Sequence, residues 1–197
     1  VKDMSRRLAR VLSTTCGVSA LCALLLAQPA PAPKQFTLVY NLNAAGYIDV
    51  CGCKHKEIRQ GSLTRRASFL KQLRATGREL LLLDGGSSLF PIEDRVKDAD
   101  LPEALRSAEL IVEAYNRMGY RALAVGAFDL AAGLDNLQKL QKKAKFPFLS
   151  ANLEDKTTGQ LYFPPHVVIE VGGVKVGVVG LTLNTLGRIY LGKVAPD

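Results

Sequence analysis

The chain has 197 residues, of which 48% are hydrophobic and 22% are charged, and its formal net charge is +8. This apolar content excludes an intrinsically disordered chain and suits one globular domain with a real core. The positive charge is spread along the sequence, and no dense run of Lys and Arg alternates with aromatic residues. The composition therefore gives little support for nucleic-acid binding.

Residues 1–32 differ from the rest of the chain. A basic start is followed by an apolar stretch and then by a Pro-rich tail of small residues. This order is typical of a secretory signal peptide, and Ala30 and Ala32 fit the small-residue rule for cleavage. We expect an exported protein, periplasmic or extracellular, with residues 1–32 removed or, if uncleaved, retained as a membrane or lipid anchor. Residues 33–197 are then the folded part.

Strands and helices alternate along that folded part. Strands are expected at 36–42, 79–84, 121–125 and 146–152, helices at 62–73, 102–118 and 133–144, and a hairpin at 166–181. The alternation predicts an α/β fold with a largely parallel sheet, closed by a C-terminal hairpin with Gly172–Gly173 at its turn. The second strand is a continuous apolar run, which is typical of a strand buried on both faces. Residues 182–197 show no regular secondary-structure pattern, which predicts an incomplete domain.

The first expected helix is strongly basic. Ser62 is the expected N-cap residue. Helical spacing predicts that four residues face the core, namely Leu63, Ala67, Leu70 and Leu73. The same spacing points the basic residues away from the core, namely Arg65, Arg66, Lys71 and Arg74.

Five segments then follow one another along nearly all of residues 36–182. They are Gly61–Arg74, Leu81–Gly86, Tyr115–Tyr120 with Ala124–Gly126 and Gly133–Leu134, Phe146–Leu153, and Gly173–Thr182. In this order they resemble the 5′-nucleotidase-like metallophosphoesterases, which have the calcineurin-like phosphoesterase fold. The resemblance implies a sheet layered with helices, of which this chain holds the N-terminal part.

The resemblance also implies a site, but the side chains depart from the family pattern. The family holds two metal ions with Asp, His and Asn at strand ends, and a bridging water attacks phosphorus. The corresponding positions here are Asn43, Ala45, Ser87, Ala127 and Phe128. Ala and Phe side chains offer no donor atom to a divalent ion. Asp84 and Asp129 remain nearby, where we expect Asp84 to cap its Gly-rich turn and Asp129 the helix that follows.

The loop after the first strand carries Cys51-Gly-Cys53. A disulfide across one residue is strained and easily reduced, which suits thiol redox chemistry, and Lys54 and His55 favour the thiolate. Alternatively, Cys51, Cys53 and His55 could hold zinc or copper. A structural disulfide or two partly buried thiols is the third interpretation, and His166 is expected to be a strand-edge residue.

Three functions follow from these observations. The first is thiol redox or metal handling on a phosphoesterase scaffold with eroded metal ligands, as in a degenerate subgroup of the family with a Cys-Gly-Cys loop; its partner would be a thiol-redox protein. The second is phosphoester hydrolysis by an altered site that uses Asn43, Asp84 and Asp129. The third is a non-catalytic scaffold that binds a nucleotide or another small phosphorylated ligand.

Overall fold

The computed structural model describes residues 34–49, 61–92 and 95–183, which all belong to one compact unit. The predicted leader lies outside the described residues. So do Cys51, Cys53, Lys54 and His55. Among the residues that are described, no helix is both long and apolar enough to cross a membrane.

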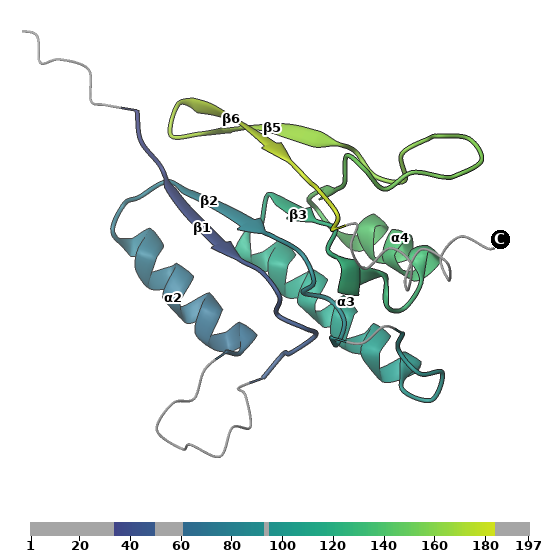
Figure 1. The fold of residues 1–197 in the computed structure, drawn as a ribbon. Helices are drawn as coiled ribbons and strands as arrows, with labels where there is room; N and C mark the ends of the chain where they lie inside the picture. The colour runs from purple at the N-terminus through teal and green to yellow at the C-terminus, as the bar shows by residue number, and fades with distance from the viewer. Residues whose placement is uncertain (1–33, 50–60, 93–94, 184–197) are drawn as a thin grey trace, which may run out of the picture. The chain divides into compact units, whose positions relative to one another are not determined.

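A four-stranded parallel sheet forms the centre of this unit (Figure 1). Its strands, in spatial order, are β1 (Thr37–Asn41), β2 (Leu80–Asp84), β3 (Ala122–Ala124) and β4 (Phe148–Leu149). β1 and β2 pair in register from Thr37 with Leu80 to Asn41 with Asp84. Parallel pairing in register brings the carboxyl ends of the strands to one edge of the sheet.

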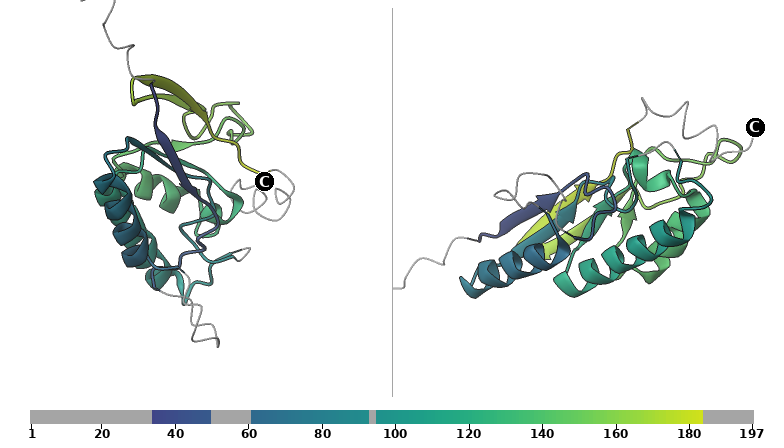
Figure 2. Two further views of the ribbon diagram at one scale, coloured as in Figure 1. Left: turned by 90° about the vertical axis from the view of Figure 1, so that its left-hand side faces the viewer. Right: turned by 90° about the horizontal axis from the view of Figure 1, so that it is seen from below.

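Helices cover one face of this sheet, as Figure 2 shows. They are α2 (Leu63–Ala75), α3 (Leu101–Met118) and α4 (Leu134–Lys143). Leu82 of β2 joins their core, while its neighbour Leu81 points to the opposite face and packs with Ile169 and Val171. Successive side chains of a strand point to opposite faces. β2 is therefore buried on both faces, as predicted.

Ile169 and Val171 belong to an antiparallel hairpin of β5 (His166–Val171) and β6 (Val174–Val179). The hairpin is a separate two-stranded sheet rather than an extension of the parallel one. Its inward side chains pack on the face of β2, so its strands do not pair with the parallel strands. The α/β class and the C-terminal hairpin are confirmed.

Two local predictions differ from the structure. The fourth strand was expected at 146–152, but β4 ends at Leu149 because Asn152 turns to bond the backbone of Thr182, with its Nδ2 2.7 Å from the carbonyl oxygen. A short 3₁₀ helix, η1 (Ala127–Leu130), also follows β3. No apolar periodicity marks so short an element.

The inward face of α2 differs from the predicted one at Arg66 and Ala67, while Leu63 contacts the core as predicted. Ser62 caps the helix as expected, since its Oγ accepts from the N–H of Arg65 at 3.2 Å. Leu70 is buried, but Ala67 is exposed and Arg66 is half-buried. The helix is turned so that Arg66 reaches the hydroxyls of Tyr115 and Tyr120. A residue pattern within one helix does not reveal a polar partner on another.

Gly177, within β6, and Gly180, just after it, test how the hairpin packs. A Cβ on Gly180 would lie 2.3 Å from the carbonyl oxygen of Leu149, whereas a Cβ on Gly177 would have nothing within 4 Å. We expect Gly180→Ala to lower the free energy of unfolding by about 2 kcal/mol, because backbone must move. Gly177→Ala should leave it unchanged or slightly higher. Urea denaturation of both variants measures the difference, and equal values would contradict the packing described.

Candidate functional site

The residues at the family's metal positions meet at the carboxyl edge of the sheet. The segment after β1 runs beside the turn after β2: the N–H of Asn43 donates to the carbonyl of Gly86 at 2.8 Å, and that of Ala45 to Ser87 at 3.1 Å. Gly126, just before η1, lies so close that a Cβ there would be 2.2 Å from the nitrogen of Ser87. The structure thus brings these positions together, with Ala127 and Phe128 following on η1.

The backbone at this edge has an unusual conformation. Asn43 and Ala45 have φ of 54° and Ser87 has φ of 55°. This left-handed region is disfavoured for residues other than glycine, by about 1–2 kcal/mol. Among the other described non-glycine residues, only Ser62 has a positive φ, and its ψ of 141° places it outside the left-handed helical region. The edge therefore keeps a specific backbone shape at three positions whose side chains differ from the family pattern.

Asp129 holds this edge together. It is 0% exposed, and its carboxylate accepts the N–H groups of Ser87 at 2.7 Å and of Ser88, Leu89 and Gly126 at 2.9 Å each. Burial raises the pKa of Asp129 to about 6, while these donors act in the opposite direction. The prediction that Asp129 caps the helix that follows, expected at 133–144, is wrong, because α4 begins after Gly133 without a side-chain cap. Besides the N–H of Gly126, Asp129 binds the turn after β2, which lies 40 or more residues earlier.

Asp84 closes the same turn from the other side, as predicted. Its Oδ1 accepts from the N–H of Gly86 at 2.7 Å and from the hydroxyl of Ser88 at 2.9 Å. Its Oδ2 accepts from Asn41 at 2.6 Å and from the hydroxyl of Tyr115 at 2.7 Å. Burial raises the pKa of Asp84, and the four donors oppose that shift. Both oxygens of Asp84 are therefore engaged within the protein.

A polar cluster that the sequence did not predict links α2 to this edge. Arg66 donates to the hydroxyl of Tyr115 at 2.6 Å, and its guanidinium carbon lies 5.4 Å from the ring centroid of Tyr115. Tyr115 stacks on Tyr120 with 3.9 Å between centroids, and the hydroxyl of Tyr120 donates to Asn41. The only sign of this cluster in the sequence is that Tyr115 and Tyr120 lie on either side of Gly119, which ends α3. The cluster joins Arg66 through Tyr115 to Asp84.

The segment with the two cysteines leaves and returns near this edge. The N–H of Leu63 donates to the carbonyl of Ile48 at 3.1 Å, so the chain comes back to its starting point across residues 49–62. Cys51, Cys53 and His55 lie within that span but outside the described residues. His166 is the exposed first residue of β5, as expected for a strand-edge position.

The two divalent ions that the resemblance implies do not fit the residues present. Asn43 offers an amide oxygen and Ser87 a hydroxyl, while Ala45, Ala127 and Phe128 offer no donor atom. The carboxylates of Asp84 and Asp129 are occupied by N–H and O–H donors. Within the described part of the chain, no group of three or more His, Cys, Asp or Glu side chains could hold a metal ion.

The chain is similar to known nucleotidases. No family model matches it. Protein UshA of Yersinia enterocolitica is 38% identical over 119 residues, which cover 60% of this chain and 20% of the relative. A 5′-nucleotidase of Vibrio cholerae is 34% identical over 131 residues, which cover 64% of this chain and 22% of the relative. A snake venom 5′-nucleotidase of Naja atra is 35% identical over 127 residues, which cover 62% of this chain and 22% of the relative. The chain spans about a fifth of the length of these relatives.

Solved structures show the same fold. The 5′-nucleotidase precursor from Thermus thermophilus matches with a TM-score of 0.61 and 25% identity, over 77% of this chain and 29% of its own. The calcineurin-like phosphoesterase YfkN from Bacillus subtilis matches with a TM-score of 0.60 and 19% identity, over 82% of this chain and 52% of its own. The metallophosphoesterase fold is confirmed, as part of a domain, and the relatives support the resemblance to 5′-nucleotidases.

The role of Asp129 can be tested by substituting it and, for comparison, a second aspartate that also accepts backbone N–H groups. Asp129→Asn replaces one acceptor oxygen by an NH₂ group that faces N–H donors, so we expect a loss of about 3 kcal/mol in the free energy of unfolding. Asp155 at the surface accepts from Thr157 at 2.9 Å and Thr158 at 2.8 Å. Asp155→Asn should therefore have a much smaller effect, because water can replace the lost contacts. Thermal or urea unfolding measures both, and an unchanged stability of Asp129→Asn would contradict the described role.

Proposed function

We propose that this chain is an exported 5′-nucleotidase-like protein that has lost metal-dependent hydrolysis at this edge, and that Cys51 and Cys53 give it a thiol redox or metal-handling role. One observation carries the first half of the proposal. The five positions where the family binds two metal ions hold one amide, one hydroxyl and no carboxylate or imidazole.

The hydrogen bonds of the edge support the loss of hydrolysis. Asp84 and Asp129 are the nearest carboxylates, and both would have to release buried N–H or O–H donors before they could bind a metal ion. An unsatisfied buried donor costs about 1–3 kcal/mol. The backbone N–H groups of residues 43–47 and 85–89 are also paired within the described protein. No backbone donor of these two segments is left to hold a phosphate group.

The described ends of the span that carries the two cysteines support the second half. Cys51 and Cys53 belong to a span whose two ends meet at Ile48 and Leu63, beside the carboxyl edge of the sheet. In the redox role, the two thiols form one S–S bond, and two electrons and two protons pass to the disulfide of a partner protein, which becomes a dithiol. In the metal-handling role, Cys51, Cys53 and His55 bind zinc or copper.

The names of the relatives support two further features. They are called UshA or 5′-nucleotidase, which supports the alternative of a non-catalytic scaffold that binds a nucleotide or another small phosphorylated ligand. One relative is a venom protein, which agrees with export of this chain and with the leader-like residues 1–32. An altered hydrolytic site built from Asn43, Asp84 and Asp129 is the less favoured alternative, because the two carboxylates are engaged.

Thiol state and metal content test the proposal on the exported full chain. Intact mass is measured after alkylation with and without a mild reductant, and metal content is read on the same sample. We expect either a Cys51–Cys53 disulfide that opens at mild potential or near-stoichiometric zinc or copper that Cys53→Ser removes. His166→Gln, at an exposed histidine outside the proposed ligand set, is the control and should change neither result. Two inert free thiols without metal would overturn the thiol role.

A further inference from the structure

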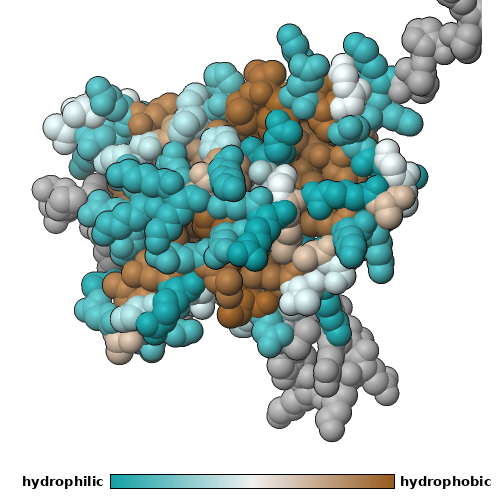
Figure 3. All heavy atoms as spheres, turned by 180° about the vertical axis from the view of Figure 1, so that it is seen from behind, coloured by the Kyte–Doolittle hydropathy of each residue, from teal (hydrophilic) through white to brown (hydrophobic). Residues whose placement is uncertain are grey.

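A groove separates α2 from α3 on the helical face of the protein. Its volume is about 660 Å³, within the range of about 300–1,000 Å³ that is common for small-molecule sites. Figure 3 shows the molecule from behind, with hydrophobic side chains exposed between hydrophilic ones. We call this hollow the α2–α3 groove; its lining residues include Leu63, Ala67, Arg74, Leu110, Ala114 and Arg117.

The walls of the groove are partly apolar because α2 and α3 leave apolar side chains beside it exposed or half-buried. Leu70 is the one buried residue of this helix. Ala67 on the adjoining face is exposed, and Leu110 of α3, across the groove, is 47% exposed. Arg66 anchors α2 through its hydrogen bonds to Tyr115 and Tyr120, which hold the helix without filling the space beside it. The rotation of α2 that leaves Arg66 half-buried thus also leaves Ala67 exposed at the wall of the groove.

The charges of the groove are segregated along its length. Arg74 and Arg117 lie in the last turns of α2 and α3, and Arg74 donates to the carbonyl oxygen of Met118, which brings the two helix ends together. The rise of an α-helix places Arg74 roughly 16 Å along α2 from Leu63. Asp49 lies at the Leu63 end, and Glu113 pairs with Arg117. Each guanidinium carries five N–H donors, more than these contacts use.

We propose that the α2–α3 groove binds a single-chain amphiphile with a carboxylate head, such as a medium-chain fatty acid. The apolar chain lies between Ala67 and Leu110, and the head lies between Arg74 and Arg117. Arginine N–H groups bind carboxylates through charge-assisted hydrogen bonds, often two in parallel. The site uses neither the two cysteines nor the metal positions, so it does not depend on the function proposed above.

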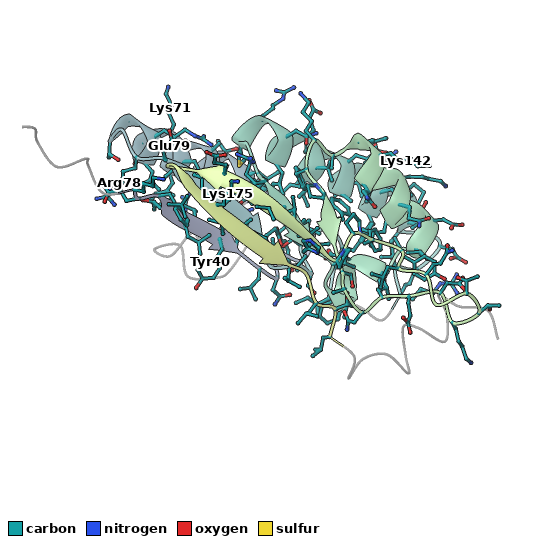
Figure 4. All side chains as sticks on the ribbon, turned by 90° about the horizontal axis from the view of Figure 1, so that it is seen from above. Tyr40, Lys71, Arg78, Glu79, Lys142 and Lys175 are labelled. Atoms are coloured by element: carbon teal, nitrogen blue, oxygen red, sulfur yellow. The ribbon has the colours of Figure 1, made fainter. Side chains whose placement is uncertain are left out.

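Calorimetric titration of the full chain with dodecanoate, below its micellar concentration, tests the proposal. We expect one site, weakened about tenfold by Arg74→Gln or Arg117→Gln, because each removes a charged donor. Ala67→Phe should abolish binding by filling the groove from an exposed position. Lys71→Gln is the matched control on α2, since Figure 4 shows Lys71 pointing outward from the helix.

Two further measurements make the result decisive. Dodecanol has the same chain without the charge and should bind at least tenfold more weakly than dodecanoate. Amide chemical shifts of the full chain should change within Leu63–Ala75 and Leu110–Met118 on addition of dodecanoate. Equal affinity for the acid and the alcohol, equal loss in Lys71→Gln and Arg74→Gln, or the absence of binding would overturn the proposal.

Discussion

The carboxylate of Asp129 is the interaction on which the carboxyl edge depends. It is fully buried and binds four backbone N–H groups, three from the turn after β2 and one from the start of η1. Successive N–H groups that converge in this way form a site for an anion. Here the anion is a side chain of the protein itself. The turn is consequently fixed against η1, and its backbone N–H groups are already hydrogen-bonded within the protein.

The rest of the edge follows from that constraint. With the turn fixed, Asp84 bonds it from the other side and, through Tyr115, connects it to Arg66 on α2. The left-handed backbone at Asn43, Ala45 and Ser87 is held by backbone hydrogen bonds between the segment after β1 and the turn after β2. The fold of the calcineurin-like phosphoesterases thus persists at an edge where the side chains differ from the metal-binding pattern. These backbone bonds do not involve the side chains at the metal positions, so the backbone shape of the edge does not depend on those side chains.

Much of the fold was predictable from local pattern. The apolar run of β2 predicted burial on both faces. Ser62 correctly predicted the start of α2, and Gly119 correctly predicted the end of α3. The role of Asp84 was predicted correctly because its turn follows within two residues. The partners of Asp129 in the turn after β2 and those of Arg66 were not predicted, since they lie 40 or more residues away in the sequence and no periodicity encodes such pairs. Side-chain chemistry at the metal positions was readable only through resemblance to a family.

The central claim is that this edge no longer supports hydrolysis assisted by divalent metal ions. The most direct test is the hydrolysis of bis(p-nitrophenyl) phosphate by the purified full chain in the presence of manganese, together with calorimetric titration of manganese into the same sample. The account predicts no turnover above that of the Asn43→Ala variant and no stoichiometric binding of manganese. Turnover that depends on manganese and disappears in Asn43→Ala would contradict it.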